Sequence, residues 1–405
     1  MNILMINKYF WKKGGSETVF FDTIKLLEEG GHSIAPFAMK NDRNHNTEYE
    51  EYFVSEVDYS KTGIVNKLIS ASKILYSFEA KKNIQKLLAV YSPDIAHFHI
   101  FQHQISPAVF GPLLDKNIPL ILTLHDLKPI CPIYTSYVDG KVCEACYGGK
   151  FINCLKNRCT KGSLLGSFVN TAEMYLHYSL QYYQKVSKYI AVSKFYKQKM
   201  VQAGFSEKNI EYLPNYIDAE KYRPVYRDDG YVLYFGRLSA EKGILTFLRS
   251  AERNSDIRHV IVGTGPLQHQ LKSEAASLSL ENVQFLGFMS GDDLKRVVAN
   301  ATCIVVPSEW YENCPMTILE AFAFGKPVIG ASIGGIPELI ADGVDGSTFE
   351  AGNIEALSEK IRWFWENRKK VMDMGREGRK KVEKKFNAER YYDSLMSIYH
   401  SAKGC

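Results

Sequence analysis

CIVVPSEWYENCPMTILEAFAFG, residues 303–325, contains the change of pattern that decides the fold class. Its first four residues form a short apolar run that predicts a buried strand, and the apolar stretch from Met316 predicts a helix. Pro315 fits the first turn of that helix, where its missing N–H costs nothing. Glu312 then lies before the helix, near its positive end, and Glu320 lies about a turn and a half inside it. A carboxylate in an apolar helix needs a partner or a hydroxyl-rich ligand, although a helix-capping Glu312 and a partly exposed Glu320 would explain the same pattern without a function.

Apolar runs typical of strands alternate with helical periodicity on both sides of this segment. The helical pattern is clearest over Ile64–Val90 and in the terminal stretch Glu389–Tyr399. This alternation predicts an α/β protein whose parallel sheets are covered on both faces. The predicted strands are Asn2–Asn7, His32–Met39, Asp94–His99, Pro119–Leu124, Lys188–Ser193, Val232–Phe235, His259–Val262, Val283–Leu286, Cys303–Val306 and Pro327–Ile329.

The chain has 405 residues, which is more than one hydrophobic core usually supports. Leu213–Pro224 has the composition of a linker, so we expect two Rossmann-like, doubly wound domains facing a central cleft. The first domain covers residues 1–220, with an insertion at 131–162 and a helix at 386–405 that packs back on it, and the second covers 221–385. Open α/β sheets bind ligands beyond the carboxyl ends of their strands, so the site residues should follow strands.

Composition excludes several classes of protein. Hydrophobic residues make up 45% and charged residues 23%, which is typical of a globular chain and excludes disorder, collagen and coiled coil. No apolar run reaches the roughly eighteen residues of a membrane span, and Lys8 interrupts the stretch where a signal peptide would stay apolar. We therefore expect a cytoplasmic protein.

The net charge of +5 conceals an uneven distribution. Residues 61–90 hold six Lys and one Glu, and residues 141–200 hold ten Lys or Arg and two Glu, so these two stretches carry +13 and the rest carries −8. The second stretch is also rich in aromatic residues. Cations with amphipathic rings suit an anionic membrane surface or a phosphate-bearing substrate, which would place the protein at the inner face of the membrane. A solvated helix face over an aromatic core would give the same composition.

Two loops of the second half could bind phosphate. Arg237 and Lys242 follow the strand Val232–Phe235 and precede a helix. The planar guanidinium of Arg237, the ammonium of Lys242 and the free backbone N–H groups at the start of the helix could together bind a diphosphate. Gly263-Thr264-Gly265-Pro266 follows the next strand. No third glycine completes a dinucleotide fingerprint, which disfavours a nicotinamide-dependent dehydrogenase.

Taken together, these motifs resemble those of family 4 glycosyltransferases. The resemblance rests on Glu312 and Glu320 separated by seven residues, Gly236-Arg237-Leu238, Glu241-Lys242-Gly243, Gly263-Thr264-Gly265-Pro266 and Gly334-Gly335-Ile336-Pro337-Glu338. Gly14-Gly15-Ser16-Glu17 resembles the family's glycine loop, Leu124-His125-Asp126 its histidine loop and the Tyr399 region its terminal helix. The resemblance implies the two-domain GT-B fold, a nucleotide-sugar donor such as a UDP- or GDP-sugar, retention of the anomeric configuration and catalysis without a metal.

The resemblance also implies a role for each matching residue. Glu312 and His125 would be catalytic, with Glu312 on the hydroxyls of the transferred sugar and His125 at the sugar or its leaving phosphate. Arg237 and Lys242 would neutralise the donor diphosphate, and Glu320 would hold the ribose. The other donor-binding positions would be Gly15, Gly263, Asn313, Cys314, Pro315 and Met316. Taken alone, His125 could equally be a structural histidine at the end of a strand. Many relatives have small or aromatic residues where Asn313 and Cys314 stand, so the sugar stays open.

Five of the eight cysteines lie between residues 131 and 159. Cys143 and Cys146 have the spacing of a zinc knuckle, and Cys154 and Cys159 could complete four thiolates, with Cys131 as a further candidate. The interpretations are a structural zinc site, an iron–sulfur or redox site, and plain thiols. The resembled family includes members with a cysteine-bearing insertion after the histidine loop.

The sequence therefore predicts a hexosyltransferase-type enzyme. It would move a sugar to a glycan or lipid-linked acceptor in cell-surface polysaccharide synthesis, with the acceptor mainly on the first domain. The alternatives are a nucleotide-sugar epimerase or hydrolase on the same fold and a non-catalytic binding protein. A nucleic-acid partner is not expected, because the chain outside the two basic stretches is acidic. The nucleotide base, the sugar, the acceptor, the linkage and the oligomeric state stay open.

Overall fold

The computed structural model describes residues 1–57 and 71–404, and the chain divides into two compact units. Unit 1 comprises Met1–Ser136, Cys143–Leu213 and Tyr392–Cys405, and unit 2 comprises Tyr137–Val142 and Pro214–Tyr391. The units meet in sequence at Leu213 and Pro214, whereas the predicted boundary was residue 220. The short hairpin at 137–142 groups with unit 2, although the predicted insertion was assigned as a whole to the first domain.

Unit 1 is built on a six-stranded parallel sheet with the strand order β2-β1-β3-β4-β7-β8. β1 pairs in register with a strand on each side, so that Leu4 lies opposite both Ala35 and Ala96. The inner strands are buried on both faces, which explains their continuous apolar sequences. The strands are β1 Asn2–Ile6, β2 Ser33–Phe37, β3 Ile95–Phe98, β4 Leu120–Leu124, β7 Lys188–Ala191 and β8 Ile210–Tyr212. The helices are α1 Gly15–Glu29, α3 Phe78–Val90, α4 Phe110–Leu114, α5 Ile152–Lys156, α6 Leu164–Ser179 and α7 Lys194–Gln202.

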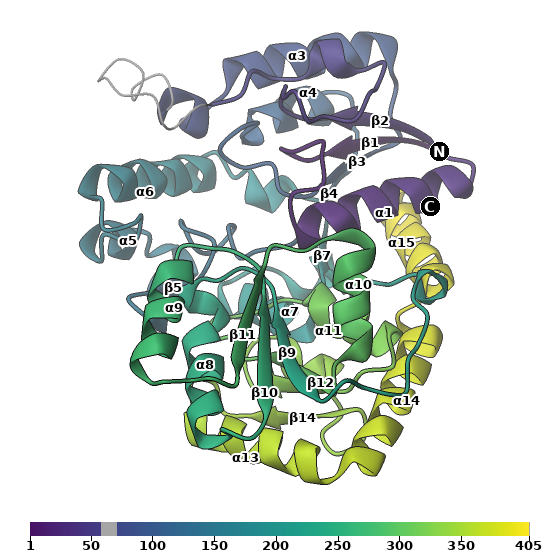
Figure 1. The fold of residues 1–405 in the computed structure, drawn as a ribbon. Helices are drawn as coiled ribbons and strands as arrows, with labels where there is room; N and C mark the ends of the chain where they lie inside the picture. Colours follow the sequence, from purple (N-terminus) through teal and green to yellow (C-terminus); the bar gives the residue numbers. More distant parts are fainter. Residues whose placement is uncertain (58–70, 405) are drawn as a thin grey trace. The chain divides into compact units, whose positions relative to one another are not determined.

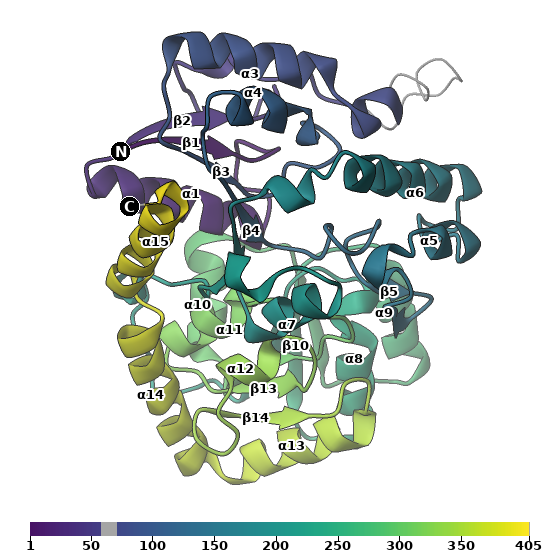
Figure 2. The ribbon, with the colours of Figure 1, turned by 180° about the vertical axis from the view of Figure 1, so that it is seen from behind.

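The C-terminal helix α15, Ala388–Lys403, completes unit 1. It lies beside α1 in both ribbon views (Figures 1 and 2). Its Tyr399 hydroxyl is 2.7 Å from His97 Nδ1 on β3, and its Tyr392 hydroxyl is 2.9 Å from His32 Nε2. Both tyrosines thus contact histidines of the first part of unit 1, one in β3 and one just before β2, more than 300 residues earlier in the sequence.

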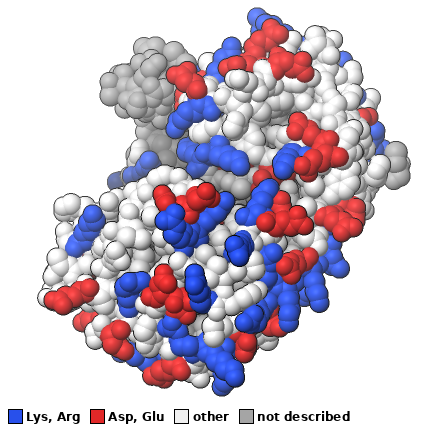
Figure 3. All heavy atoms as spheres, turned by 45° about the vertical axis from the view of Figure 1, so that its right-hand side comes forward, with Lys and Arg blue, Asp and Glu red and all other residues white. Residues whose placement is uncertain are grey.

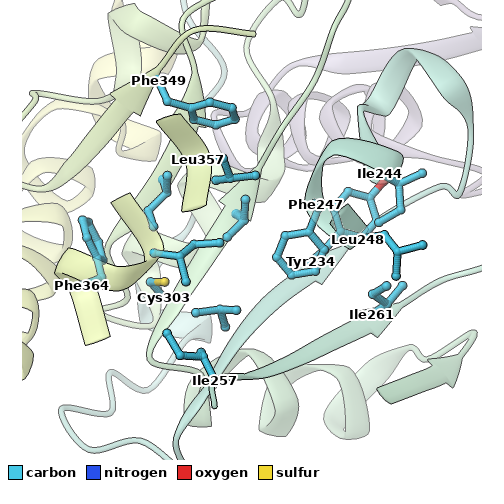
Figure 4. Packing of buried hydrophobic residues seen from close by; sticks show 14 of the residues in the cluster. Tyr234, Ile244, Phe247, Leu248, Ile257, Ile261, Cys303, Phe349, Leu357 and Phe364 are labelled. Carbon is cyan, nitrogen blue, oxygen red and sulfur yellow. The ribbon is translucent and has the colours of Figure 1, made fainter. Parts of the chain in front are cut away.

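Unit 2 is built on a second six-stranded parallel sheet, with the order β11-β10-β9-β12-β13-β14. Figure 4 shows its core, in which Phe247 and Leu248 of one helix lie near Tyr234 of the sheet, and Phe364 of another helix lies near Cys303. The strands are β9 Tyr231–Phe235, β10 Arg258–Val262, β11 Val283–Gly287, β12 Cys303–Val306, β13 Val328–Ala331 and β14 Gly346–Phe349, and the hairpin strands are β5 Tyr137–Val138 and β6 Lys141–Val142. The helices are α8 Ile244–Arg253, α9 Gln268–Ser277, α10 Gly291–Asn300, α11 Met316–Ala323, α12 Ile336–Leu339, α13 Ile354–Glu366 and α14 Arg368–Lys385.

Several elements differ from the sequence predictions. The strands β8 and β14 and the helix α6 were not predicted. The predicted helix Ile64–Val90 is helical at residues 71–75 but is interrupted before α3, which begins at Phe78, where the Ser77 hydroxyl accepts a hydrogen bond from the Ala80 N–H (3.1 Å). The part of that prediction at 64–70 lies outside the described residues. Pro315 occupies the position before α11 instead of its first turn.

Positive and negative side chains are interspersed on the face of the molecule drawn in Figure 3. None of the helices within residues 1–57 and 71–404 is long and apolar enough to cross a membrane.

Candidate active site

The strand order of unit 2 reverses between β9 and β12, and this is where open α/β sheets bind their ligands. The loop after β9 carries Arg237 and Lys242, and the loop after β12 carries Glu312. The sequence-predicted residues of this domain therefore leave neighbouring strands at the same sheet edge. Arg237 is exposed and Lys242 is half-buried.

Lys242 and Glu312 form an ion pair at this edge. Lys242 Nζ lies 2.6 Å from Glu312 Oε1, and the Ser308 hydroxyl donates to the same oxygen over 2.7 Å. Burial disfavours the charged carboxylate, but the attraction of Lys242 and these hydrogen bonds hold the pKa of Glu312 below its ordinary value. Lys242 also lies over the Trp310 ring, 4.9 Å from its centroid. The site thus holds an ionised acid and a cation in contact.

Two glycines let the loops pack this closely. Gly243 has a left-handed backbone (φ +64°), and a Cβ there would collide with the Pro307 carbonyl oxygen of the loop after β12. Gly263 has φ +133°, and a Cβ there would collide with the Gly236 carbonyl oxygen. The Leu238 N–H also donates to the Thr264 carbonyl over 3.0 Å. The loops after β9, β10 and β12 therefore form one packed surface.

The segment Asn313–Met316 leads into α11. The Asn313 side chain accepts a hydrogen bond from the Cys314 N–H (2.5 Å), and the Asn215 amide donates to the Cys314 carbonyl (3.0 Å). Burial raises the pKa of Cys314 to about 12, so this thiol is not a nucleophile at neutral pH. Glu320 is half-buried on α11, which is compatible both with a ligand-facing carboxylate and with a partly exposed one, so its role stays a prediction.

Ser308 and Asn215 support this site, but the sequence analysis did not single them out. Ser308 follows the β12 strand and lies four residues before Glu312, so its position after a strand could have indicated a site residue. Asn215 lies in the linker, where only the fold brings it to Cys314.

In unit 1 the equivalent reversal lies between β1 and β3. Gly15 is exposed and is the first residue of α1, so its N–H belongs to the helix N-terminus that follows β1. His125 follows β4 and is partly exposed, and burial lowers its pKa to about 4. His125 is therefore neutral at physiological pH.

His99, which the sequence analysis included only as the end of a strand, contacts His125. Its Nδ1 lies 2.8 Å from His125 Nε2, and the two rings stack with centroids 5.0 Å apart. Phe20 of α1 packs edge-on against the His99 ring. Burial holds the pKa of His99 well below its ordinary value. Because both rings are neutral, one must donate its N–H to the other, so His99 constrains which nitrogen of His125 carries the proton.

The five clustered cysteines lie in the predicted insertion of unit 1. Cys131, Cys146 and Cys154 are buried, while Cys143 and Cys159 are partly exposed. Thiol–thiol hydrogen bonding with Cys159 lowers the pKa of Cys154 to about 7. In the part of the chain that the structure describes, no three His, Cys, Asp or Glu side chains are placed to hold a metal ion. The zinc site stays a prediction.

Comparison with known proteins identifies the family. Residues 13–221 match the family described as Glycosyltransferase Family 4, and residues 218–381 match Glycosyl transferases group 1. The uncharacterized glycosyltransferase MJ1178 of Methanocaldococcus jannaschii is 24% identical, over 98% of each chain. The amylovoran biosynthesis glycosyltransferase AmsK of Erwinia amylovora is 27% identical over 52% of this chain and 55% of its own. The O-antigen chain mannosyltransferase C of Escherichia coli is 31% identical, over 42% and 46% respectively.

Solved structures share the fold. HepE of Anabaena, solved with UDP and glucose, superposes with a TM-score of 0.70 at 18% identity, covering 99% of this chain and 100% of its own. Sucrose-phosphate synthase of Thermosynechococcus elongatus gives 0.73 at 17% identity, covering 99% and 98%. The predicted GT-B fold with two Rossmann-like domains is confirmed, and so is the prediction of a transferase enzyme. Since the first of the two family matches spans more than half of the sequence, the chain belongs to glycosyltransferase family 4.

Proposed function

We propose that this glycosyltransferase transfers a hexose from a UDP- or GDP-sugar to a glycan or lipid-linked acceptor, with retention, in cell-surface polysaccharide synthesis. HepE, which shares the fold, was solved with UDP and glucose. AmsK is named for amylovoran biosynthesis, and the Escherichia coli relative is named as a mannosyltransferase of the O-antigen chain. The hexose donor and the glycan or lipid-linked acceptor are part of this proposal.

The contact between Lys242 and Glu312 carries the proposal. A cation and a carboxylate held at the reversal of a doubly wound sheet offer both groups that a sugar diphosphate needs: positive charge for the phosphates and an acceptor for hydroxyls. The exposed Arg237 adds a second cation five residues earlier in the same loop.

In the proposed reaction the bond between the sugar and the diphosphate breaks, and negative charge grows on the departing phosphate. Arg237 and Lys242 would stabilise that charge more in the transition state than in the bound donor. Glu312, ionised by its partners, would orient sugar hydroxyls, and Glu320 would bind the ribose. His125, neutral and fixed by His99, would accept or donate one hydrogen bond at the sugar or its phosphate.

Two routes to retention fit these residues. In the first, the acceptor attacks the face that the phosphate leaves, and the leaving phosphate assists by taking the acceptor's proton. In the second, a covalent intermediate forms and is then displaced. The buried Cys314 thiol does not serve as its nucleophile. Neither route uses a catalytic metal, and a zinc site in the cysteine cluster would be structural.

Calorimetric titration with UDP and with GDP tests the donor site. We expect one nucleotide to bind, and Arg237→Ala and Glu320→Ala to weaken it at least tenfold, about 1.4 kcal/mol. Arg296→Ala is the matched control, because Arg296 is an exposed arginine on α10 whose ion pair is with the surface residue Asp293. Its affinity should match that of the wild type. Failure of a folded protein to bind either nucleotide would refute the donor site.

Product analysis then separates the enzyme classes. The matching nucleotide-sugar, given with a glycan acceptor, should yield a product whose anomeric configuration equals that of the donor. Donor turnover at the same rate without acceptor would instead identify an epimerase or hydrolase. Nucleotide binding without any turnover would identify a non-catalytic binding protein.

A further inference from the structure

Helix α6 of unit 1 buries five polar side chains beside one apolar one, Met174, and exposes several large apolar side chains. A helix packed on a globular core normally shows the opposite arrangement. The buried polar residues are Ser167, Asn170, Thr171, Glu173 and His177. The exposed apolar residues are Leu164 (56% exposed), Leu165 (61%), Phe168 (57%) and Tyr175 (43%). The helix therefore presents a hydrophobic surface outward.

Hydrogen bonds and one ion pair fix this orientation. Glu173 Oε2 lies 2.6 Å from the Nζ of Lys128, and both side chains are fully buried. The Asn170 amide donates to the Thr160 hydroxyl over 2.8 Å, and His177 Nε2 lies 3.0 Å from the Leu75 carbonyl oxygen. Rotating the helix to bury its apolar side would leave the Lys128–Glu173 pair broken and a charge unpaired, at a high cost in free energy. The exposed side is thus a stable feature of the fold.

Helix α5 extends the apolar surface. α5 and α6 lie side by side in Figures 1 and 2. The Ile152 N–H donates to the Tyr175 hydroxyl over 3.1 Å, the Phe151 and Tyr175 rings pack edge-on, and the Ile152 side chain is 41% exposed. We call these exposed residues the apolar patch: Ile152, Leu164, Leu165, Phe168 and Tyr175.

The same segment is strongly basic. From Ala145 to Ala172 the sequence contains four cationic side chains and no Asp or Glu. All four are exposed, and we call them the basic rim: Lys150, Lys156, Arg158 and Lys161. On the face drawn in Figure 3, by contrast, both signs of charge are interspersed.

We propose that the apolar patch and basic rim dock on the surface of an anionic lipid bilayer. Large apolar side chains that enter the interface, together with cations at the level of the headgroups, are the combination that holds amphipathic helices on such membranes. A second copy of this chain would bring a second basic rim against the first, so the charge favours lipid over self-association. The proposal deepens the proposed function, since it would bring the enzyme to a lipid-linked acceptor.

Vesicle flotation of the full-length protein tests the proposal. At low salt we expect binding to vesicles of equimolar phosphatidylglycerol and phosphatidylcholine, and much weaker binding to phosphatidylcholine alone. The double substitution L165E/F168E should lower binding at least tenfold. The double substitution K156Q/R158Q should lower binding to the anionic vesicles only, by roughly fivefold for each charge removed.

The matched control is Phe288→Glu, which changes an exposed aromatic residue of unit 2 (74% exposed) and should leave binding unchanged. All variants should keep the thermal midpoint and the nucleotide affinity of the wild type. Nucleotide binding thus reports separately on the proposed function, which can fail while vesicle binding succeeds. Equal binding to both kinds of vesicle, or wild-type binding by L165E/F168E, would overturn the proposal. So would a concentration-dependent dimer that this variant abolishes.

Discussion

Replacing Lys242 with Met should destabilise unit 2, because it leaves Glu312 charged and buried without its cation. Lys242 Nζ and Glu312 Oε1 are 2.6 Å apart, and the exposed fraction is 28% for the lysine side chain and 6% for the glutamate. Removing one partner of a fully buried pair costs roughly 3–5 kcal/mol, whereas breaking an exposed pair costs roughly 0–1 kcal/mol. For this half-buried lysine we expect a loss of about 1–3 kcal/mol in the free energy of unfolding near neutral pH.

The pH dependence identifies the cause. In the wild type Lys242 holds the pKa of Glu312 below its ordinary value, so the pair stabilises the fold above that value and the benefit fades as the pH falls. In Lys242→Met the hydrogen bond from Ser308 still favours the carboxylate, but without the cation burial dominates and raises the pKa of Glu312. The folded variant then takes up a proton more readily than the unfolded chain. Its deficit relative to wild type should therefore shrink as the pH falls from about 8 to about 5.

Urea unfolding followed by tryptophan fluorescence measures this loss. Trp310, Trp363 and Trp365, three of the four tryptophans, belong to unit 2. Lys272→Met is the matched control, because Lys272 is exposed on α9 and its loss should cost less than about 0.5 kcal/mol. Adding Glu312→Gln to Lys242→Met should recover most of the lost stability. The reasoning is refuted if Lys242→Met costs no more than Lys272→Met, or if its cost is the same at both pH values.

Three further predictions concern unit 1. His99→Phe removes the hydrogen bond to His125 and should lower kcat about tenfold, the equivalent of one lost hydrogen bond. It should also shift the pH profile of kcat, and His99→Gln should partly restore both. An unchanged pH profile of kcat would contradict the role assigned to His99. Burial lowers the pKa of His97 to about 3 and that of His125 to about 4, so below about pH 6.5 the unfolded chain binds protons that the folded protein does not. The thermal midpoint should therefore fall as the pH drops below about 6.5. A thermal midpoint that does not change with pH in this range would contradict the neutral state of these histidines. Metal analysis tests the zinc site predicted from the cysteine spacing. If that prediction is right, the protein contains about one zinc per chain and Cys146→Ser contains less, whereas a metal-free protein with freely titrating thiols would exclude the site.

The sequence was sufficient to predict those strands whose continuous apolar residues are buried on both faces of the sheet. The runs at Cys303–Val306 and Pro119–Leu124 became strands buried on both faces, because central parallel strands need continuous apolar sequences. The short strand β8 lies at the edge of its sheet, and its sequence, Ile210–Tyr212, alternates too briefly to stand out. Helix α6 escaped prediction for a different reason: its inward side is polar, which removes the usual signal of a packed helix.

The candidate site was predictable where neighbours in sequence become neighbours in space. Glu312 and Lys242 follow adjacent strands of one sheet, so their contact follows from the strand order. The link between Asn215 and Cys314 joins residues 99 positions apart through the linker, and no local pattern indicates it. The pairing of His99 with His125 likewise depends on β3 and β4 being adjacent.

The placement of α15 has a consequence for how the protein is made. Most of unit 1 precedes unit 2 in the sequence, yet Tyr392 and Tyr399, which contact His32 and His97, are synthesised only after the whole of unit 2. Unit 2 has its own sheet and core, and its ends adjoin, with the Tyr216 and Tyr391 rings 4.7 Å apart. Unit 1 is thus completed only after unit 2, and a ribosome that stops after Tyr391 releases a complete unit 2 attached to a first sheet that still lacks the contacts of Tyr392 and Tyr399.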